Sequence, residues 1–447
     1  MIYNKLVKNI SLPLSDFFMG TSINKNLNFL KKSEWFSLEA LQKNQNKSLR
    51  NILRYSYREI PYYNKLFKSI NLRPEEIKTS SDLKKIPILN KDIIRENYND
   101  FFPIGFNTSN SKKSQTGGST GNPLSYYRSW SDHSWSKAVR YRAWSYGGHQ
   151  IGNKVMTLAG SSLTNSNPTI KHKILYNLIE RTRKLSAFDM SEERMHEYYS
   201  SFKDYNPHHF RGYANSLFEF SNFINRNDYN LDGVKSVFSA AEKLDSEKRP
   251  IIEKAFNAKV FDNYGAGDGS AFANECEIHS GLHMDMEVGV IEFLNKGENV
   301  EEDYGDIVST SLINYDFPLI RYEVGDIGKP TNEKCVCGRF HTLIDEIVGR
   351  NHDFIKAGNG KLVHGEFFSH LVRKHIPEIL QFQVHQKSLN YLEMKIRTKI
   401  DLNSDKISHI RKIIEDKVGS SSKVSIKIVD EIKPSSSGKW KFIISDI

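Results

Sequence analysis

Cysteine is scarce in this sequence of 447 residues, which contains only Cys276, Cys335 and Cys337. An odd and small number of cysteines argues against a disulfide framework. Long apolar runs are missing as well, because no stretch approaches the roughly 18 residues that a membrane-spanning helix needs. The first residues, MIYNKLVKNISLPLSDFF, contain neither an uninterrupted apolar segment nor a small-residue cleavage site. We therefore expect a cytoplasmic protein without a membrane span.

The sequence also lacks a concentrated block of one charge. Lysine and arginine outnumber aspartate and glutamate by 63 to 53, but they are spread along the chain and no nucleic-acid-binding motif accompanies them. A mildly basic protein attracts anionic small molecules, so we expect such substrates and no nucleic acid. With 38% hydrophobic and 12% aromatic residues, the composition is that of a globular protein, and the length predicts two or three domains.

What the sequence does contain is a stretch rich in glycine and hydroxyl residues, TGGSTGNP at 116–123. Glycine lets the backbone turn tightly and approach a ligand, and the exposed N–H groups of such a loop bind phosphate. A Walker A loop is excluded, because no Gly-Lys-Ser/Thr closes the stretch. Taken alone, the stretch fits either a phosphate-binding loop or a flexible surface loop.

Hydrophobic spacing predicts the organisation of the rest of the chain. Apolar residues recur at helical spacing in 35–57 and 130–144, and strands at 234–238 and 259–262 flank a helix at 246–256. This alternation predicts α/β layers, in which ligands bind beyond the carboxyl ends of the strands. From Gly289 onward short strands predominate, which predicts a strongly bent sheet or a small barrel.

A polar break at Gly349-Arg350 suggests a domain boundary. The region beyond it reads as a hairpin at 382–398, a helix at 404–418 and a strand at 424–429, the order of a small α+β domain. The predicted fold class is therefore α/β. It comprises a large layered N-terminal domain with a β-rich subdomain (1–349) and a small α+β C-terminal domain (350–447).

Six segments follow one another in an order that is more specific than any of them alone. They are the glycine-rich loop, Ser239-Ala240-Ala241-Glu242, Asn263-Tyr264-Gly265, PLIRYEVGDIG at 318–328, Gly349-Arg350 and Ser437-Gly438-Lys439. Together they resemble the adenylate-forming (acyl-AMP) ligase superfamily, in its phenylacetate–CoA ligase and CapK-like branch, over essentially the whole chain. The resemblance implies that ATP activates a carboxylate to an acyl-adenylate with release of pyrophosphate. A nucleophile then displaces AMP.

The resemblance also implies which residues would bind each part of ATP. The loop residues would hold the β- and γ-phosphates: Thr116, Gly117, Gly118, Ser119, Thr120 and Gly121. Asn263, Tyr264 and Gly265 would line the adenine, with Glu242 beside them. Asp326 would accept the ribose hydroxyls, since its two oxygens suit a vicinal diol. Arg350 would meet ribose or phosphate, and Lys439 would reach the α-phosphate and the carboxylate. The predicted catalytic set is Lys439, Thr116, Asp268 and Arg350.

The sequence departs from the family at two positions. The family writes Tyr-Gly-x-Thr-Glu, with the glutamate on magnesium, whereas this chain has Gly267 and Asp268 there. Asp268 can ligate Mg²⁺, although its side chain is shorter and the threonine hydroxyl is missing. Family enzymes rotate the small, mobile C-terminal domain about a hinge residue that is usually aspartate. In this chain His352 occupies that position. By family position the acid pocket would comprise Phe210, Gly212, Tyr213, Ala240 and Ala266, a set that does not name the acid.

The three cysteines also suggest a metal site. Three cysteines and one histidine make a closed tetrahedral zinc set, and some members of this branch carry a structural zinc in such positions. We choose His283 over His279 as the fourth ligand, because it matches the Gly-Leu-His pattern of the branch. Reduced, unpaired thiols are the alternative.

The acyl acceptor stays open between two classes. By analogy with CapK-like proteins we favour an amine, such as an amino sugar in surface polysaccharide synthesis. The alternative is coenzyme A, as in phenylacetate–CoA ligases. A degenerate, non-catalytic adenylate-forming fold is a third reading, supported by Asp268 and His352. The expected cofactors are ATP, Mg²⁺ and structural Zn²⁺, with coenzyme A if it is the acceptor; a homodimer is left open.

Overall fold

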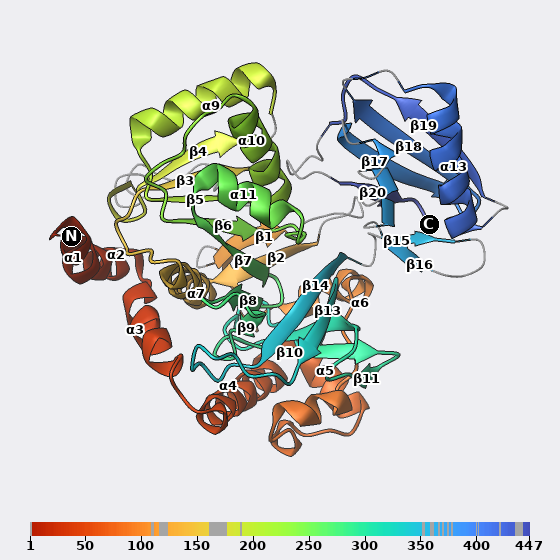
Figure 1. Cartoon of the computed structure of the whole chain (residues 1–447). Helices are drawn as coiled ribbons and strands as arrows, with labels where there is room; N and C mark the ends of the chain where they lie inside the picture. Colours follow the sequence, from red (N-terminus) through yellow and green to blue (C-terminus); the bar gives the residue numbers. More distant parts are fainter. Residues whose placement is uncertain are drawn as a thin grey trace. The chain divides into compact units, whose positions relative to one another are not determined.

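The structure is a computed structural model, shown in Figure 1. It describes residues 2–108, 111–115, 124–160, 177–187 and 190–350. In the C-terminal part it describes 354–357, 362–364, 367–368, 371–372, 375–376, 379–398, 400, 402–419, 422–433 and 441–447. The chain divides into two units, Met1–Val348 and Gly349–Ile447. None of the described helices has both the length and the apolar content that crossing a membrane would require.

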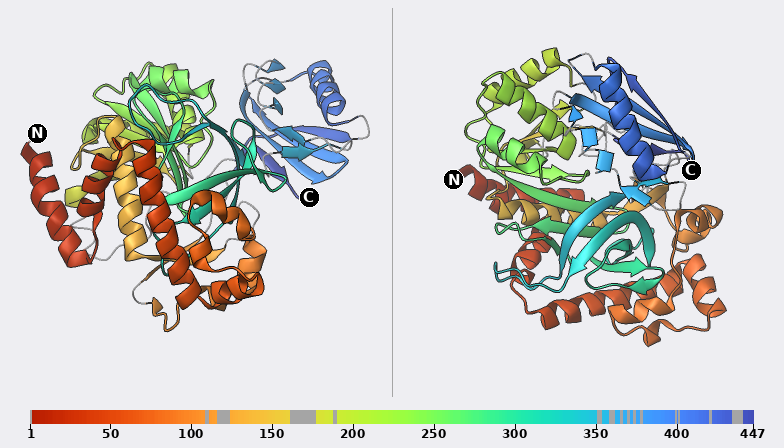
Figure 2. Two further views of the ribbon diagram at one scale, coloured as in Figure 1. Left: turned by 90° about the horizontal axis from the view of Figure 1, so that it is seen from below. Right: turned by 45° about the vertical axis from the view of Figure 1, so that its right-hand side comes forward.

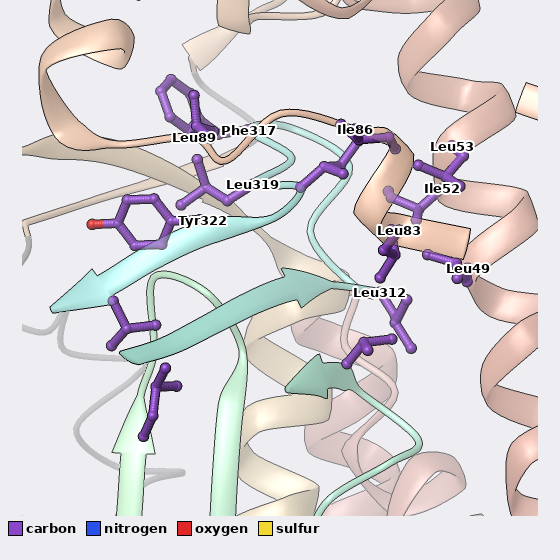
Figure 3. Packing of buried hydrophobic residues seen from close by; sticks show 14 of the residues in the cluster. Leu49, Ile52, Leu53, Leu83, Ile86, Leu89, Leu312, Phe317, Leu319 and Tyr322 are labelled. Carbon is purple, nitrogen blue, oxygen red and sulfur yellow. The ribbon is translucent and has the colours of Figure 1, made fainter. Parts of the chain in front are cut away.

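Helices dominate the first hundred residues. The predicted helix at 35–57 is α4, which runs from Leu38 to Glu59 and begins where the Ser37 hydroxyl accepts the Ala40 N–H. Its Leu49, Ile52 and Leu53 pack with Leu83 and Ile86 in a buried cluster (Figure 3). The other helices here are α1 (Ile2–Leu6), a π-helical turn (Val7–Ser11), α2 (Leu12–Met19), α3 (Ile23–Ser33), α5 (Pro61–Ser69) and α6 (Lys91–Glu96).

A single mixed sheet of twelve strands forms the centre of the first unit, in the order β11-β10-β12-β13-β14-β9-β8-β7-β6-β5-β3-β4. Its parallel part consists of β3 (Val155–Ala159), β4 (Thr182–Ser186), β5 (His209–Tyr213), β6 (Ser236–Ala240) and β7 (Lys259–Ala266). The other strands are β8 (Ala271–Glu275), β9 (Leu282–Met284), β10 (Gly289–Asn295), β11 (Glu298–Asn299), β12 (Gly305–Ser311), β13 (Tyr322–Thr331) and β14 (Leu343–Arg350).

The strands after Gly289 continue the central sheet and do not close into the small barrel that was one of the two predicted arrangements. They are hydrogen-bonded to the parallel strands, because the short strand β9 pairs with both β8 and β14. The β-rich part is therefore an extension of the central sheet.

Helices cover both faces of the parallel strands. One face packs against α9 (Glu192–Tyr205), α10 (Ala214–Arg226) and α11 (Lys248–Phe256) through a buried cluster that includes Met156, Leu158, Phe210, Val237 and Val260. The opposite face packs against α7 (Trp130–Tyr146) and α3 through another cluster, where Trp144 stacks on Phe238. Figure 2 shows α3 and α7 side by side. Successive side chains of a strand alternate between these two faces.

The second unit is built on a four-stranded sheet of order β19-β18-β17-β20. Its strands are β17 (Ile379–Ser388), β18 (Tyr391–Thr398), β19 (Lys423–Ile428) and β20 (Ile443–Ser445), and its long helix is α13 (Ser404–Val418). A two-stranded sheet, β15 (Phe354–Lys356) with β16 (Leu362–His364), completes it. This is the α+β arrangement predicted for the C-terminal part, and the predicted fold class is confirmed.

Candidate functional site

A cavity of about 310 Å³ opens at the carboxyl ends of the parallel strands. Ala240 and Ala241, at the end of β6, and Asn263, Tyr264 and Gly265, in the last part of β7, all line it. This is the position at which ligands bind in layered α/β folds. Four of these five residues belong to the adenine and acid-pocket assignments: Ala240, Asn263, Tyr264 and Gly265.

Tyr264 and Asp326 meet beside this cavity. The Tyr264 hydroxyl donates to Asp326, with Oη and Oδ2 2.9 Å apart. Tyr264 lies on β7, whereas Asp326 lies on β13, on the other side of β8, β9 and β14 in the sheet order. The structure thus brings together the two residues to which we assigned adenine and ribose.

Asp268 lies in the turn of the β7–β8 hairpin. Its Oδ1 accepts the Gly269 N–H at 3.2 Å, and its Oδ2 accepts the Tyr322 hydroxyl at 3.2 Å. The turn packs closely against the sheet, since a Cβ at Gly269 would overlap the Ser309 hydroxyl. Mg²⁺ is usually bound by one or two carboxylates together with substrate phosphates, so a single carboxylate in this turn fits that ion.

Glu242 holds the start of a helix. Its Oε2 accepts the Asn215 N–H at 2.9 Å, in the first turn of α10. A carboxylate at this place satisfies an N–H that has no partner within the helix. The cavity itself is lined by Ala240 and Ala241, the two residues that precede Glu242.

Several predicted residues lie outside the described part of the chain. They are the whole glycine-rich stretch from Thr116 to Pro123, His352, Asp353 and Lys439, together with the side chain of Arg350. The strands that flank the glycine-rich stretch are described: β1 (Ser111–Gln115) and β2 (Ser125–Ser129) form an antiparallel pair. Asn314 fixes this hairpin to the body by accepting the Ser129 N–H and donating to the Tyr127 carbonyl.

The predicted acid pocket needs correction at Phe210. This side chain is fully buried and packs against Phe220 and Phe256, on the sheet face that α10 and α11 cover. It faces away from the cavity because side chains alternate along β5. Its neighbour Arg211 lines the cavity instead, and the sequence interpretation missed it. Tyr213 is likewise fully buried, with Ala159 and Ala187.

Basic residues gather on the remaining wall of the cavity: Lys112, Arg128, Lys137, Arg140, Lys184 and Arg211. Lys137 and Arg140 both reach Glu180, with nitrogen–oxygen distances of 2.7 and 3.4 Å. Arg128 forms an ion pair with Asp132. Burial, followed by the charges of Lys137 and Arg128, lowers the pKa of His133 to about 2. His133 is therefore neutral in this wall.

A second cluster lies away from the cavity and contains all three cysteines. One ligand atom from each of Cys276, His283, Cys335 and Cys337 lies within 4.8 Å of the others. The Cys276 and Cys335 sulfurs are 3.6 Å apart, and Cys337 Sγ lies 3.6 Å from His283 Nε2. His279 lies outside this group and contacts Glu275 through Nδ1 at 3.1 Å. Three sulfurs and one imidazole nitrogen at such distances fit tetrahedral zinc.

Backbone and side-chain contacts support this cluster. The Ile278 N–H donates to Cys276 Sγ, and the Arg339 N–H donates to Cys337 Sγ. The Arg339 guanidinium lies over the rings of Trp35 and Tyr146 and forms two hydrogen bonds to Glu277. The cluster joins the end of β8 to the segment after β13, so a metal there would connect two distant parts of the first unit.

The chain is similar to known proteins over most of its length. A family model described as the CapK C-terminal domain matches residues 355–446. Protein CapK of Staphylococcus aureus is 25% identical over 410 residues, which cover 90% of this chain and 89% of that protein. These matches show that the chain is similar to the phenylacetate–CoA ligase and CapK-like branch of the adenylate-forming ligases. A phenylacetate–coenzyme A ligase of Thermus thermophilus is 24% identical over 330 residues, covering 71% of this chain and 72% of the ligase.

The fold of this CapK-like chain has solved counterparts. 2-Hydroxyisobutyryl-CoA ligase, in the postadenylation state with an acyl-AMP, superposes with a TM-score of 0.71 at 16% identity. The match covers 93% of this chain and 92% of that one. Identity at this level establishes the shared fold alone.

Proposed function

We propose that the protein activates a carboxylic acid with ATP. A carboxylate oxygen of the acid attacks the α-phosphorus, the α–β phosphoanhydride bond breaks, and pyrophosphate leaves. An acceptor nucleophile then attacks the acyl carbon and releases AMP. The observation that carries the proposal is the meeting of Tyr264 and Asp326 beside a cavity at the strand ends.

Within this proposal Asp326 accepts the ribose hydroxyls and Tyr264, held by Asp326, lines the adenine. Gly265 leaves room for the Phe272 ring beside β7, because a Cβ there would lie 3.1 Å from that ring. Asp268 would hold Mg²⁺, which supplies positive charge at the phosphates when bound. Glu242 acts indirectly, because it fixes the start of α10 behind the Ala240-Ala241 wall.

Three further roles rest on sequence alone. We propose that the glycine-rich loop, with Thr116, Ser119 and Thr120, holds the triphosphate tail. Arg350 would meet the ribose or a phosphate at the domain boundary, and Lys439 would reach the α-phosphate. We further propose that the C-terminal domain moves between the two half-reactions.

For the acceptor we propose an amine, such as an amino sugar of a surface polysaccharide. This choice rests on analogy with CapK-like proteins, whose C-terminal domain model matches residues 355–446. Coenzyme A is the alternative acceptor, and the phenylacetate–coenzyme A ligase relatives support it. We also propose that Cys276, His283, Cys335 and Cys337 bind a structural zinc ion.

The decisive experiment is ATP–pyrophosphate exchange over a panel of carboxylic acids, including amino and hydroxy acids. At least one acid should support exchange. Lys439→Ala should reduce the exchange rate by 100-fold or more while ATP binding persists, because the lost charge acts on the α-phosphate as it reacts. Mass spectrometry with coenzyme A or amino sugars then identifies the acceptor. An absence of exchange with every acid would favour the non-catalytic reading.

A further inference from the structure

A row of polar side chains crosses the central sheet on the face toward α7. Thr157 on β3 is paired with Lys184 on β4 and with Arg211 on β5, and all three line the cavity. The alternate positions on these strands, Leu158, Leu185 and Phe210, belong to the apolar cluster on the other face. The strand register therefore places one basic residue on each side of Thr157, and both face into the cavity.

Helix α7 contributes a matching row from the opposite wall. His133, Lys137, Arg140 and Trp144 follow one another at spacings of four, three and four, which places them on one face of the helix. All four line the cavity. The guanidinium groups of Arg140 and Arg211 each lie over the Trp144 ring, 5.4 Å from its centroid. Cations from both walls thus converge at this indole.

Positive charge exceeds negative charge in this wall. Six lysines and arginines line it, against Glu180 and the carboxylates of Asp132 and Asp268 that act on Arg128, an excess of three among the described residues. Like charges held this close repel one another, and a bound anion would offset that repulsion.

We propose that this basic wall binds a second anionic group, a carboxylate or a phosphate, on the acid that the protein activates. The inference rests on the proposed function. Arg140 and Arg211 offer planar groups that suit bidentate recognition of either anion. Ala240, Ala241 and Gly265 line the same cavity beside the proposed nucleotide site, so one acid molecule can reach both regions.

Paired acids of equal chain length test this inference in the exchange assay. We compare glutarate with pentanoate, and 3-phosphoglycerate with glycerate, using the full-length protein. The charged member of at least one pair should have a kcat/KM at least 10-fold higher. Arg211→Gln and Arg140→Gln should each raise the KM for that acid by 10-fold or more and leave the KM for ATP within about 2-fold. The exposed Lys43→Gln removes the same charge on α4 and should change neither value.

Three outcomes would overturn the inference. The first is that uncharged acids react with the same kcat/KM as charged acids. The other two are that the arginine variants raise only the KM for ATP, or raise only the KM for the acceptor. The last two would assign the basic wall to the triphosphate or to the acceptor. Calorimetric titration with glutarate or inorganic phosphate, without ATP, separates this inference from the proposed function. Saturable binding that Arg211→Gln abolishes supports the basic wall even if no acid gives exchange, whereas no binding up to about 10 mM contradicts it.

A second, independent observation concerns the first helices, 2–19. Seven of the eighteen large hydrophobic residues that are exposed in the described chain lie there: Ile2, Tyr3, Leu6, Ile10, Leu14, Phe17 and Phe18. Phe17 and Phe18 are 80% and 71% exposed. The opposite side of the same helices holds Val7 and Leu12, which are buried in the cluster under α3 and α7. An apolar surface of this extent marks an interaction site.

The positive charge around this apolar surface indicates which kind of partner it binds. Lys5 and Lys8 are exposed on the same helices, and Lys25, Lys31 and Lys32 are exposed on α3. A second copy docked by two-fold symmetry would bring these lysines toward their own equivalents. An anionic lipid surface attracts them and accepts the apolar side chains between its headgroups. We infer that residues 2–19 bind the surface of an anionic membrane.

Vesicle sedimentation tests this inference. The full-length protein should sediment with phosphatidylcholine vesicles containing about 30% phosphatidylglycerol, and at least 10-fold less with phosphatidylcholine alone. Phe17→Ser with Phe18→Ser should reduce binding by 10-fold or more without changing the circular dichroism spectrum, since both side chains are exposed. Lys5→Gln with Lys8→Gln should reduce it mainly at low salt. A protein that fails to sediment with either vesicle, or that forms a dimer which the Phe17 and Phe18 changes dissociate, would overturn the inference.

Discussion

The hydroxyl of Tyr264 donates to the carboxylate of Asp326 across 2.9 Å, although 62 positions separate the two residues in the chain. In the sheet order, β8, β9 and β14 lie between their strands, β7 and β13. The bond therefore spans a strongly curved part of the sheet. It holds the proposed adenine-lining residue against the proposed ribose acceptor.

The first prediction concerns this pair. Asp326→Asn replaces an acceptor oxygen with an amide that donates, and it should raise the KM for ATP by 10-fold or more in the exchange assay. Tyr264→Phe removes one hydrogen bond, worth about 1 kcal/mol, and should raise that KM by about 5-fold. The double variant should show less than the product of the two effects, because the residues are bonded to each other. Glu298→Gln, exposed on β11, is the matched control. Independent effects in the double variant would contradict the coupling.

The second prediction concerns the cysteine cluster. Purified protein should contain about one zinc ion per chain, and Cys335→Ser should remove most of it. Loss of a structural zinc removes a cross-link between distant segments, so the melting temperature should fall by about 5 °C or more. His279→Gln is the control, because His279 contacts Glu275 and lies outside the cluster. A metal-free protein that is fully folded and has three titratable thiols would contradict the site.

Sequence reasoning succeeded where the determining interactions are local. The helix α13 was predicted at 404–418 and has those bounds, since its apolar spacing and the Asn403 cap lie within the helix itself. The cysteine cluster was predicted as a set because the chain offers only three thiols. The choice of His283 over His279 came from the family pattern, and the structure places His283 with the cysteines.

It failed where the partner is distant. The strand predicted at 259–262 runs on to Ala266, because residues 263–266 pair with β8 after a hairpin. In the β-rich part, β13 begins only at Tyr322, since Arg321 has a left-handed φ of 55°. Alternation along β5 separates Phe210 from Arg211, but which face meets the cavity depends on neighbouring strands. The missed Arg211 carried one signal, a charged residue between apolar ones in a buried strand.

The third prediction concerns that left-handed arginine. Arg321 forms an ion pair with Glu292 at 3.1 Å and donates to the Ile86 carbonyl at 2.7 Å, and both charged side chains are buried. Arg321→Met would leave Glu292 as an uncompensated buried charge, at a cost of about 3–5 kcal/mol in the free energy of unfolding. Urea unfolding checks this.

Two comparisons make the result specific. Adding Glu292→Leu to Arg321→Met should restore much of the lost stability, because the unpaired charge is then gone. The half-exposed pair of Lys329 and Asp345 is the control, and Lys329→Met should leave the free energy of unfolding nearly unchanged. Equal losses in the two methionine variants would show that the buried pair has no special role.

The fourth prediction is a dependence of stability on pH. Burial, followed by the neighbouring carboxylate of Glu275, raises the pKa of Asp262 from its usual range to about 7. The folded chain therefore holds this proton over a range in which the unfolded chain has released it. Stability falls as the pH rises from about 4 to about 7, by up to about 1.4 kcal/mol per pH unit from this one group.

Asp262→Asn removes the titrating group and should flatten that slope. The variant should gain stability relative to the wild type as the pH rises from 5 to 8, with the difference levelling off above about pH 7. Urea unfolding followed by tryptophan fluorescence suits the measurement, because four of the five tryptophans lie in the first unit: Trp35, Trp130, Trp135 and Trp144. A difference that stays constant from pH 5 to pH 8 would mean that Asp262 is already ionised at pH 5. Asp262 would then be a fixed charge beside Asn263, the first residue of the proposed nucleotide segment.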